Sequence, residues 1–118
     1  MTLDRFTTKS AEALQEAARL SQSHGNQATD SLHLLAAILN QQEGLAASLF
    51  PYLNVAVPAL AGQVDGEIER LPKVSGSVPV GQLVISDDLN TVLRKAEEEM
   101  TALKDEYVSI EHLLIALA

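Results

Sequence analysis

The sequence contains no cysteine and no tryptophan, and only two phenylalanines and two tyrosines occur among its 118 residues. The absence of cysteine excludes a disulfide framework, a thiolate nucleophile and a cysteine-ligated zinc site. The scarcity of aromatic residues removes the stacking platforms on which single-stranded nucleic acids bind. The chain has instead 19 leucines and 16 alanines, which are strong helix formers. This composition favours an all-α fold with an aliphatic core.

Basic residues are also scarce, because 8 lysines and arginines stand against 16 acidic residues, for a formal net charge of −8. Such a chain lacks the basic surface that neutralises a nucleic-acid backbone or an anionic membrane. It has no apolar run of the ~18–20 residues that a membrane span needs, and its first residues do not resemble a signal peptide. We therefore expect no nucleic-acid partner, no membrane partner and a cytoplasmic location. The length predicts a single domain over residues 1–118.

Capping residues and apolar stripes at helical spacing divide the chain into helices and loops. Thr7 and Ser86 are good N-caps, and Thr29 or Asp30 is a good start for a second helix. Residues 72–82 include two prolines and two glycines, which predicts an exposed loop. The helices that we expect cover residues 7–23, 29–40, 44–50, 58–70, 86–103 and 109–118.

The buried faces of these helices follow from the spacing of small and apolar residues. Residues 34–39 are apolar on every side, as is typical of a helix enclosed in a bundle. Gly62 and Gly66 lie one turn apart, so they either weaken their helix or admit a closely packed neighbour, and we favour close packing. The expected buried face is Ala11, Leu14, Ala17, Ala18 and Ser21 on the first helix, and Leu89, Val92, Leu93, Ala96, Met100 and Leu103 on the helix after Ser86.

An internal duplication organises the chain. A shift of 79 residues places Thr7 on Ser86 and His33-Leu-Leu on His112-Leu-Leu. The two aligned segments then match in their N-caps, their apolar stripes and their loop lengths. We therefore expect a duplicated helical repeat that packs about a pseudo-twofold axis.

The two repeats differ in extent. The given sequence reaches residue 118, which corresponds to Leu39 of the first repeat, so residues 40–71 have no counterpart in it. We therefore expect a second repeat that is truncated at residue 118, whose last helix has one under-covered face unless further sequence, a second chain or a tilt covers it. The boundaries that we expect are about 6–74 for the first repeat, about 72–83 for the linker and about 85–118 for the partial second repeat.

No pattern indicates catalysis. None of the six glycines precedes a lysine, so a Walker nucleotide-binding loop is absent. His24, His33 and His112 lack the spacing of metal ligands, and we expect neither a metal site nor an enzyme. His33 and His112 lie near helix N-termini, where positive charge is unfavourable. They are predicted to be neutral rings that hydrogen-bond inside the bundle and fix the loops before them.

The remaining hypothesis is a binding module. Polar and apolar residues occur together at the start of the first helix and, with several acidic residues, at the start of the last helix. A twofold axis would bring these two helix starts together. The resulting groove would have an apolar floor and acidic lips, suited to apolar peptide segments with basic flanks. The candidates for the groove are Leu3, Phe6, Tyr107 and Ile110.

Four segments of the sequence resemble the N-terminal domain of ClpB-type disaggregases, which are ring-forming AAA+ chaperones of the Clp family. The Leu-Asp-Arg-Phe-Thr opening and the Arg-Leu-Pro-Lys-Val segment are more similar to ClpB than to the protease-associated ClpA and ClpC. The four segments are Leu3–Leu14, His33–Leu39, Arg70–Gly76 and Asp105–Leu114.

The resemblance implies a Clp N-domain without ATPase activity of its own, in a hexameric stress-response chaperone whose ATP and Mg²⁺ sites lie in AAA+ modules outside this chain. It implies that the domain contacts unfolded or aggregated polypeptides and passes them to the AAA+ ring. The substrate contacts implied by the family are Thr7, Asp105 and Glu111. An alternative is an adaptor-docking N-domain of a ClpA/ClpC-type unfoldase, with an adaptor protein as partner.

Overall fold

The structure is a computed structural model that describes residues 5–41, 57–71 and 85–117. Within these residues the secondary structure is helical, which confirms the all-α class. The helices are α1 (Thr8–Ser23), α2 (Ser31–Leu39), α4 (Val57–Glu69), α5 (Asp87–Ala102) and α6 (Ile110–Leu117). The expected helix over 44–50 and the expected loop over 72–82 lie outside the described residues.

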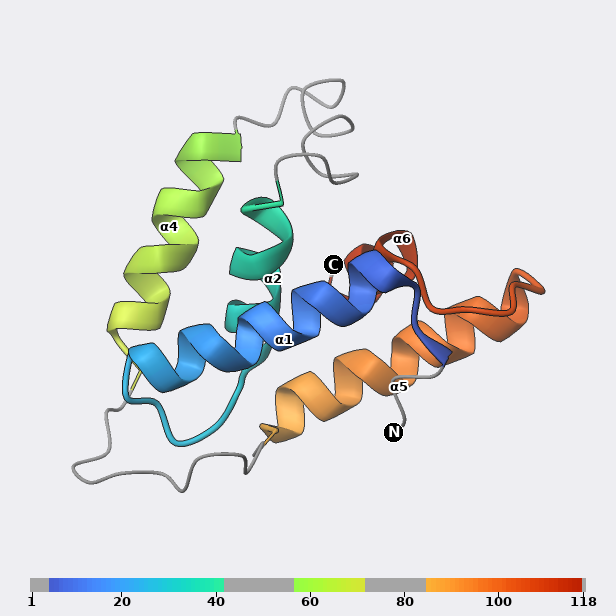
Figure 1. Cartoon of the computed structure of the whole chain (residues 1–118), viewed down its shortest axis with the longest axis horizontal. Coiled ribbons are helices and arrows are strands. Elements are labelled where there is room, and N and C mark those ends of the chain that lie inside the picture. Colours follow the sequence, from blue (N-terminus) through green and yellow to red (C-terminus); the bar gives the residue numbers. More distant parts are fainter. Residues whose placement is uncertain (1–4, 42–56, 72–84, 118) are drawn as a thin grey trace.

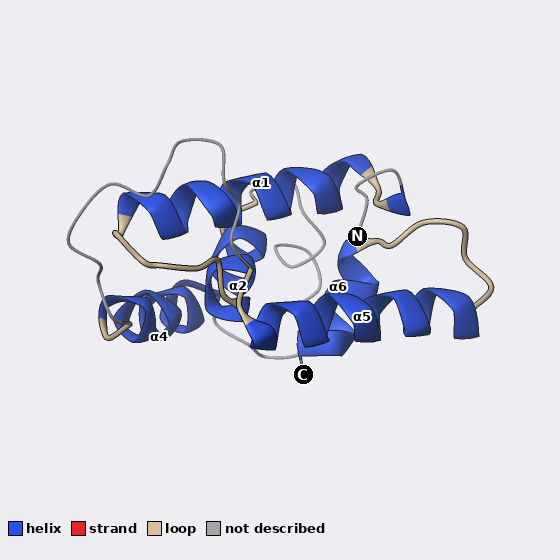
Figure 2. Ribbon diagram, turned by 90° about the horizontal axis from the view of Figure 1, so that it is seen from below, coloured by secondary structure: helices blue, strands red, loops and turns tan. Residues whose placement is uncertain are grey.

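The helices pack in layers. α1 and α5 lie on opposite sides, with α2 and α6 between them (Figure 2). α4 packs against α2, at the end of the molecule opposite the α5–α6 loop (Figure 1). The enclosed position of α2 explains its nearly continuous apolar sequence. The largest core side chains, each less than 2% exposed, include Leu34, Ile38, Ile68, Leu89, Met100, Val108 and Leu113.

Side-chain caps determine where the helices start. The Thr7 hydroxyl accepts a hydrogen bond from the backbone N–H of Ser10 at 3.2 Å. The Ser86 hydroxyl accepts from the N–H of Leu89 at 3.1 Å. Asp30 caps α2 in the same way. Each cap satisfies a backbone donor that the helix itself leaves unpaired, and the three predicted helix starts are confirmed.

Two short parallel bridges join the repeats, and the 79-residue shift exchanges one bridge for the other. The N–H of Thr7 donates to the carbonyl of Val108 at 2.9 Å, and the N–H of Ser86 donates to the carbonyl of Thr29 at 2.9 Å. The shift takes Thr7 to Ser86 and Thr29 to Val108. Each repeat therefore pairs the start of its first helix with the segment before the second helix of the other repeat. This reciprocal pairing confirms the predicted pseudo-twofold arrangement.

The ends of α1 and α5 also correspond. Gly25 has a φ of 69° and Lys104, at the equivalent position, has a φ of 59°. Both residues adopt the left-handed conformation that commonly closes a helix. Glycine takes this conformation without strain, whereas a residue with a Cβ atom is disfavoured there.

Two predictions about packing need correction, the first only in part. The buried face of α1 is Ser10, Ala13, Ala17 and Ser21. Ala17 and Ser21 were predicted, whereas the other predicted residues, Ala11, Leu14 and Ala18, are only partly buried. Gly62 and Gly66 are exposed, and no group that the structure describes lies within 4 Å of the Cβ that either residue would have. The two glycines therefore weaken α4 without admitting a close neighbour from the described part of the chain.

Leu103 also departs from the prediction. It continues the apolar stripe of α5 in the sequence, but it lies after the last helical residue, as the C-cap. Because the chain turns away at this point, Leu103 is 57% exposed. It thus belongs to the α5–α6 loop and not to the core.

Candidate functional site

The start of α1 and the segment before α6 lie side by side. Besides the bond from Thr7 to Val108, the N–H of Val108 donates to the carbonyl of Arg5 at 2.6 Å. These backbone bonds place Thr7 next to the segment that contains Asp105 and Glu111. The three residues expected to contact substrate therefore come from two neighbouring elements, one from each repeat.

Thr7 has a clear structural role. Its hydroxyl accepts from the N–H of Ser10 and donates to the Ser10 hydroxyl at 2.9 Å. Ser10 is fully buried, so this contact also satisfies a polar group in the core. Glu111 is exposed in the first turn of α6, where the helix dipole stabilises a negative charge.

Asp105 is bound by a buried histidine. The N–H of Ser109 donates to Nδ1 of His112 at 2.9 Å, so Nδ1 is an acceptor and the ring proton is on Nε2. Nε2 therefore donates to the Asp105 carboxylate, at 2.9 Å. The side chain of His112 is 3% exposed and that of Asp105 is 52% exposed. The Asp105 carboxylate is thus hydrogen-bonded to a buried ring on one side and open to solvent on the other.

The first repeat contains the same arrangement with a neutral partner. The N–H of Asp30 donates to Nδ1 of His33 at 2.8 Å, and His33 Nε2 contacts the side-chain oxygen of Asn26 at 2.9 Å. Asn26 is buried, in contrast to Asp105. Burial lowers the pKa of His33 below its usual value, while the charge of Asp30 opposes the shift. The predicted role of both histidines as hydrogen-bonded rings in the bundle is confirmed.

The partner of each histidine was not among the predicted residues. Asn26 and Asp105 each precede their histidine by seven residues. The 79-residue shift places Asn26 on Asp105 as well as His33 on His112. That correspondence was available in the sequence as a signal for the two pairs.

The groove candidates occupy different environments. Phe6 is 6% exposed and Ile110 is 5% exposed, so both are core residues with almost no surface for a ligand. Tyr107 is 52% exposed. Leu103, which was not among the candidates, is also exposed and lies in the same loop as Tyr107. Leu3 lies outside the described residues.

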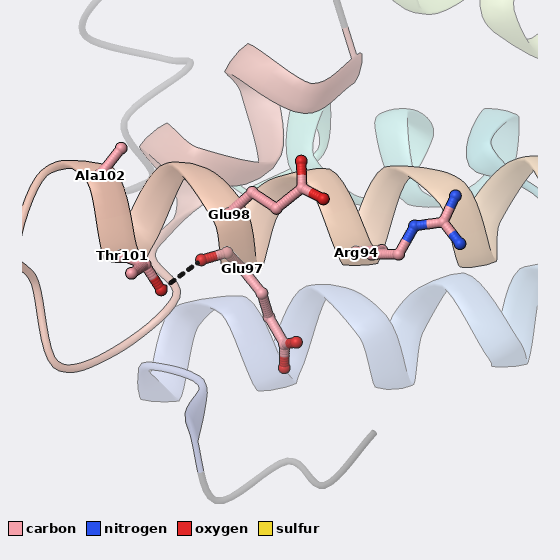
Figure 3. A pocket seen from close by; sticks show the side chains of 5 residues that line it. All are labelled: Arg94, Glu97, Glu98, Thr101 and Ala102. Carbon is pink, nitrogen blue, oxygen red and sulfur yellow. Dashed lines mark hydrogen bonds between the residues drawn. The ribbon is translucent and has the colours of Figure 1, made fainter.

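An open depression of about 460 Å³ runs along α5. Its lining residues come from three successive turns of α5 and share one face of the helix, along which Glu98 and Arg94 extend (Figure 3). The depression ends at Ala102, directly before the loop that contains Leu103 and Tyr107. It is lined by Arg94, Glu97, Glu98, Thr101 and Ala102.

The described residues form neither a metal-binding cluster nor a membrane-spanning helix. Among the described residues, no group of three or more histidine, aspartate and glutamate side chains is placed to hold a metal ion. In the same parts of the chain, every helix is too short or too polar to cross a membrane.

Known proteins share both the sequence and the fold. The chaperone protein ClpB of Bacillus cereus is 40% identical over 119 residues, which cover all of this chain and 14% of that protein. The ClpB of Porphyromonas gingivalis is 41% identical over 117 residues, which cover 99% of this chain and 13% of that protein. The chain therefore spans about one seventh of the length of these relatives.

Among solved structures, the Hsp104 N-terminal domain from Candida albicans matches with a TM-score of 0.85 and 24% identity. The match covers 97% of this chain and 73% of that one, and at this identity it speaks for the fold alone. The Clp repeat (R) N-terminal domain family matches residues 5–118. Family match, sequence identity and fold agree, and the chain belongs to the Clp N-terminal domain family.

Proposed function

We propose that this chain is the client-binding domain of a ClpB-type chaperone. It contacts unfolded or aggregated polypeptides through Thr7, Asp105 and Glu111, and the longer protein passes them to a hexameric AAA+ ring. The identity of about 40% to ClpB proteins over the whole chain supports this assignment. Nucleotide hydrolysis, with its ATP and Mg²⁺, belongs to the rest of the protein, which we place in the cytoplasm.

The difference between Asp105 and Asn26 is the main support for the site. Both side chains accept from a buried histidine ring at 2.9 Å. The neutral amide oxygen of Asn26 therefore accepts from the histidine ring without carrying a charge. Because the equivalent position of the first repeat holds a neutral amide, we infer that this hydrogen bond does not require a charge and that the negative charge of Asp105 is available for binding a partner.

The loop around Asp105 adds apolar contacts. Leu103 and Tyr107 are each more than half exposed and lie two residues to either side of Asp105. An exposed leucine and an exposed tyrosine provide anchoring surface for an apolar segment. Glu106 and Glu111, which are also exposed, add to the negative charge nearby. The surface therefore fits a polypeptide segment with an apolar centre and basic flanks.

The test is a charge removal that preserves the hydrogen bond. Asp105→Asn recreates in the second repeat the pair that His33 and Asn26 form in the first, so the fold should be retained. We expect affinity for a fluorescent peptide with a leucine-rich centre and lysine flanks to fall about three- to tenfold. Asp88→Asn is the matched control, because it removes one exposed charge at the start of α5 and should leave affinity unchanged.

A second probe separates client binding from non-specific attraction. The chain should bind unfolded casein in preference to folded albumin, and Asp105→Asn should weaken casein binding. Equal binding of casein and albumin, or equal affinities of Asp105→Asn and the unchanged chain, would overturn the proposed function.

A further inference from the structure

The Asp105 carboxylate is held by a ring that cannot readily reorient. His112 lies in the first turn of α6, in the core, and is 2% exposed. Its Nδ1 accepts from the N–H of Ser109, and the Ser109 hydroxyl lies 3.0 Å from the same nitrogen. Burial and these contacts leave one direction for the Nε2–H bond, which points to Asp105. The orientation of an exposed carboxylate is therefore set from inside the fold.

The donor orients the carboxylate without cancelling its charge. Because Nδ1 is an acceptor, the ring that donates from Nε2 is the neutral tautomer. A lysine or arginine at this place would hold Asp105 by an ion pair and would compete with a basic client. A neutral donor leaves the negative charge for an incoming cation, and the half-exposed side chain leaves room for it.

We propose that His112 is a positioning residue for client binding, which holds the Asp105 carboxylate in the orientation that meets the basic flank of a client segment. This role depends on the proposed function, because it requires Asp105 to contact clients. His112 itself is buried and does not touch the client. Without the ring, the Asp105 side chain would sample several rotamers, and binding would have to restrict it again at a cost in entropy.

The decisive variant is His112→Gln. Ser109 precedes position 112 by three residues, so this change creates the Ser-x-x-Gln pattern of a capping box, in which the glutamine side chain accepts from the Ser109 N–H. The helix start is thus preserved, while the donor that reaches Asp105 is lost. We expect affinity for the lysine-flanked peptide to fall about three- to tenfold. Affinity for the same peptide with serine flanks should stay unchanged.

A double-mutant cycle distinguishes positioning from general loss of structure. In the Asp105→Asn background, His112→Gln should cause no further loss of affinity for the lysine-flanked peptide, since the charge to be oriented is gone. A purely structural role would lower affinity equally in both backgrounds and for both peptides, and would overturn the inference. His33→Gln is the matched control, because it makes the equivalent change beside the neutral Asn26 and should leave affinity unchanged.

The outcomes distinguish the positioning role of His112 from the proposed function. If Asp105→Asn weakens binding and His112→Gln does not, the positioning role is wrong and the proposed function stands. If neither variant weakens binding, the client site itself is wrong. Urea unfolding of each variant shows that the compared chains are folded under the conditions of the binding measurement.

Discussion

In the first repeat, the buried ring of His33 is hydrogen-bonded to the buried amide of Asn26. In the second repeat, the equivalent ring of His112 is hydrogen-bonded to the half-exposed carboxylate of Asp105. Both arrangements have a backbone N–H that donates to Nδ1 of the histidine, at 2.8 Å in the first repeat and at 2.9 Å in the second. The first repeat therefore acts as an internal control for the second. What both repeats share is needed for folding, and what only one has is a candidate for function.

The repeats also differ in how the second helix is covered. α4 packs on α2, and Ala36 of α2 is 3% exposed. Its equivalent on α6, Ile115, is 49% exposed. Among the described residues, no helix packs on α6 in the position equivalent to that of α4 on α2. The same helical pattern thus gives an enclosed helix in one repeat and an open face in the other.

The largest effect on stability should come from removing the partner of His33, and the equivalent change beside His112 should have a smaller effect. Asn26→Ala leaves the Nε2–H of His33 without an acceptor in the core, and should lower the free energy of unfolding by about 2 kcal/mol. Asp105→Ala lets water approach His112 where the carboxylate was half exposed, and should cost under about 1 kcal/mol. Urea unfolding at neutral pH measures both.

The opposite ranking of the two losses would contradict the proposed difference between Asn26 and Asp105. If Asp105→Ala destabilised the chain as much as Asn26→Ala, the carboxylate would be a structural requirement and not a surplus charge. Asp88→Ala provides a reference for removing an exposed acid in the first turn of a helix, where a loss of about 0.3–1 kcal/mol is ordinary.

A pH-dependent effect should follow from His33. Burial lowers its pKa from the usual 6.5, so the unfolded chain binds a proton at this residue more readily than the folded chain. The contribution of His33 to stability is therefore complete above pH 6.5 and is lost as the pH falls below that value. Between about pH 7.5 and about pH 5.5, the free energy of unfolding should decrease more in the unchanged chain than in His33→Gln.

The measurement is urea unfolding of both chains at each pH. This range ends above the titration of ordinary carboxylates, so the difference between the two chains isolates the histidine. Parallel pH profiles would mean that His33 is as easily protonated in the fold as in the unfolded chain.

Local features of the fold were predictable from the sequence. Thr7, Asp30 and Ser86 are caps whose side chains bond to donors within three residues, so nothing distant is needed to find them. The duplication was visible because both repeats keep the same caps and the same His-Leu-Leu start. From these features the all-α class and the pseudo-twofold pairing followed.

Features that depend on distant neighbours were harder to predict. The buried face of α1 includes Ser10 and Ala13, because small residues allow neighbouring helices to approach, and hydrophobicity does not reveal this. Leu103 fits the periodicity of α5 but lies past its end. Phe6 and Ile110 were expected at a groove and are buried, because the segments that meet there pack directly on the core.

A smaller gain in stability is expected from Lys104→Gly. Lys104 has the left-handed conformation that Gly25 adopts in the first repeat. Glycine removes the steric cost of this conformation but has more freedom in the unfolded chain, so the net gain should be about 0.5–1 kcal/mol. The midpoint of thermal unfolding measures it. Lys104→Ala keeps the Cβ atom and should bring no gain, which separates the backbone effect from the loss of charge.

The smallest effect should be that of Ile115→Ser, on the open face of α6. A surface change away from caps and buried contacts alters stability by less than about 0.5 kcal/mol. The equivalent change in the first repeat, Ala36→Ser, places a hydroxyl at a buried position of α2 and should cost about 1 kcal/mol. Urea unfolding at two protein concentrations compares them. A large loss for Ile115→Ser that grows with concentration would mean that a second copy of the chain covers this face, so the open face of the second repeat would be an interface.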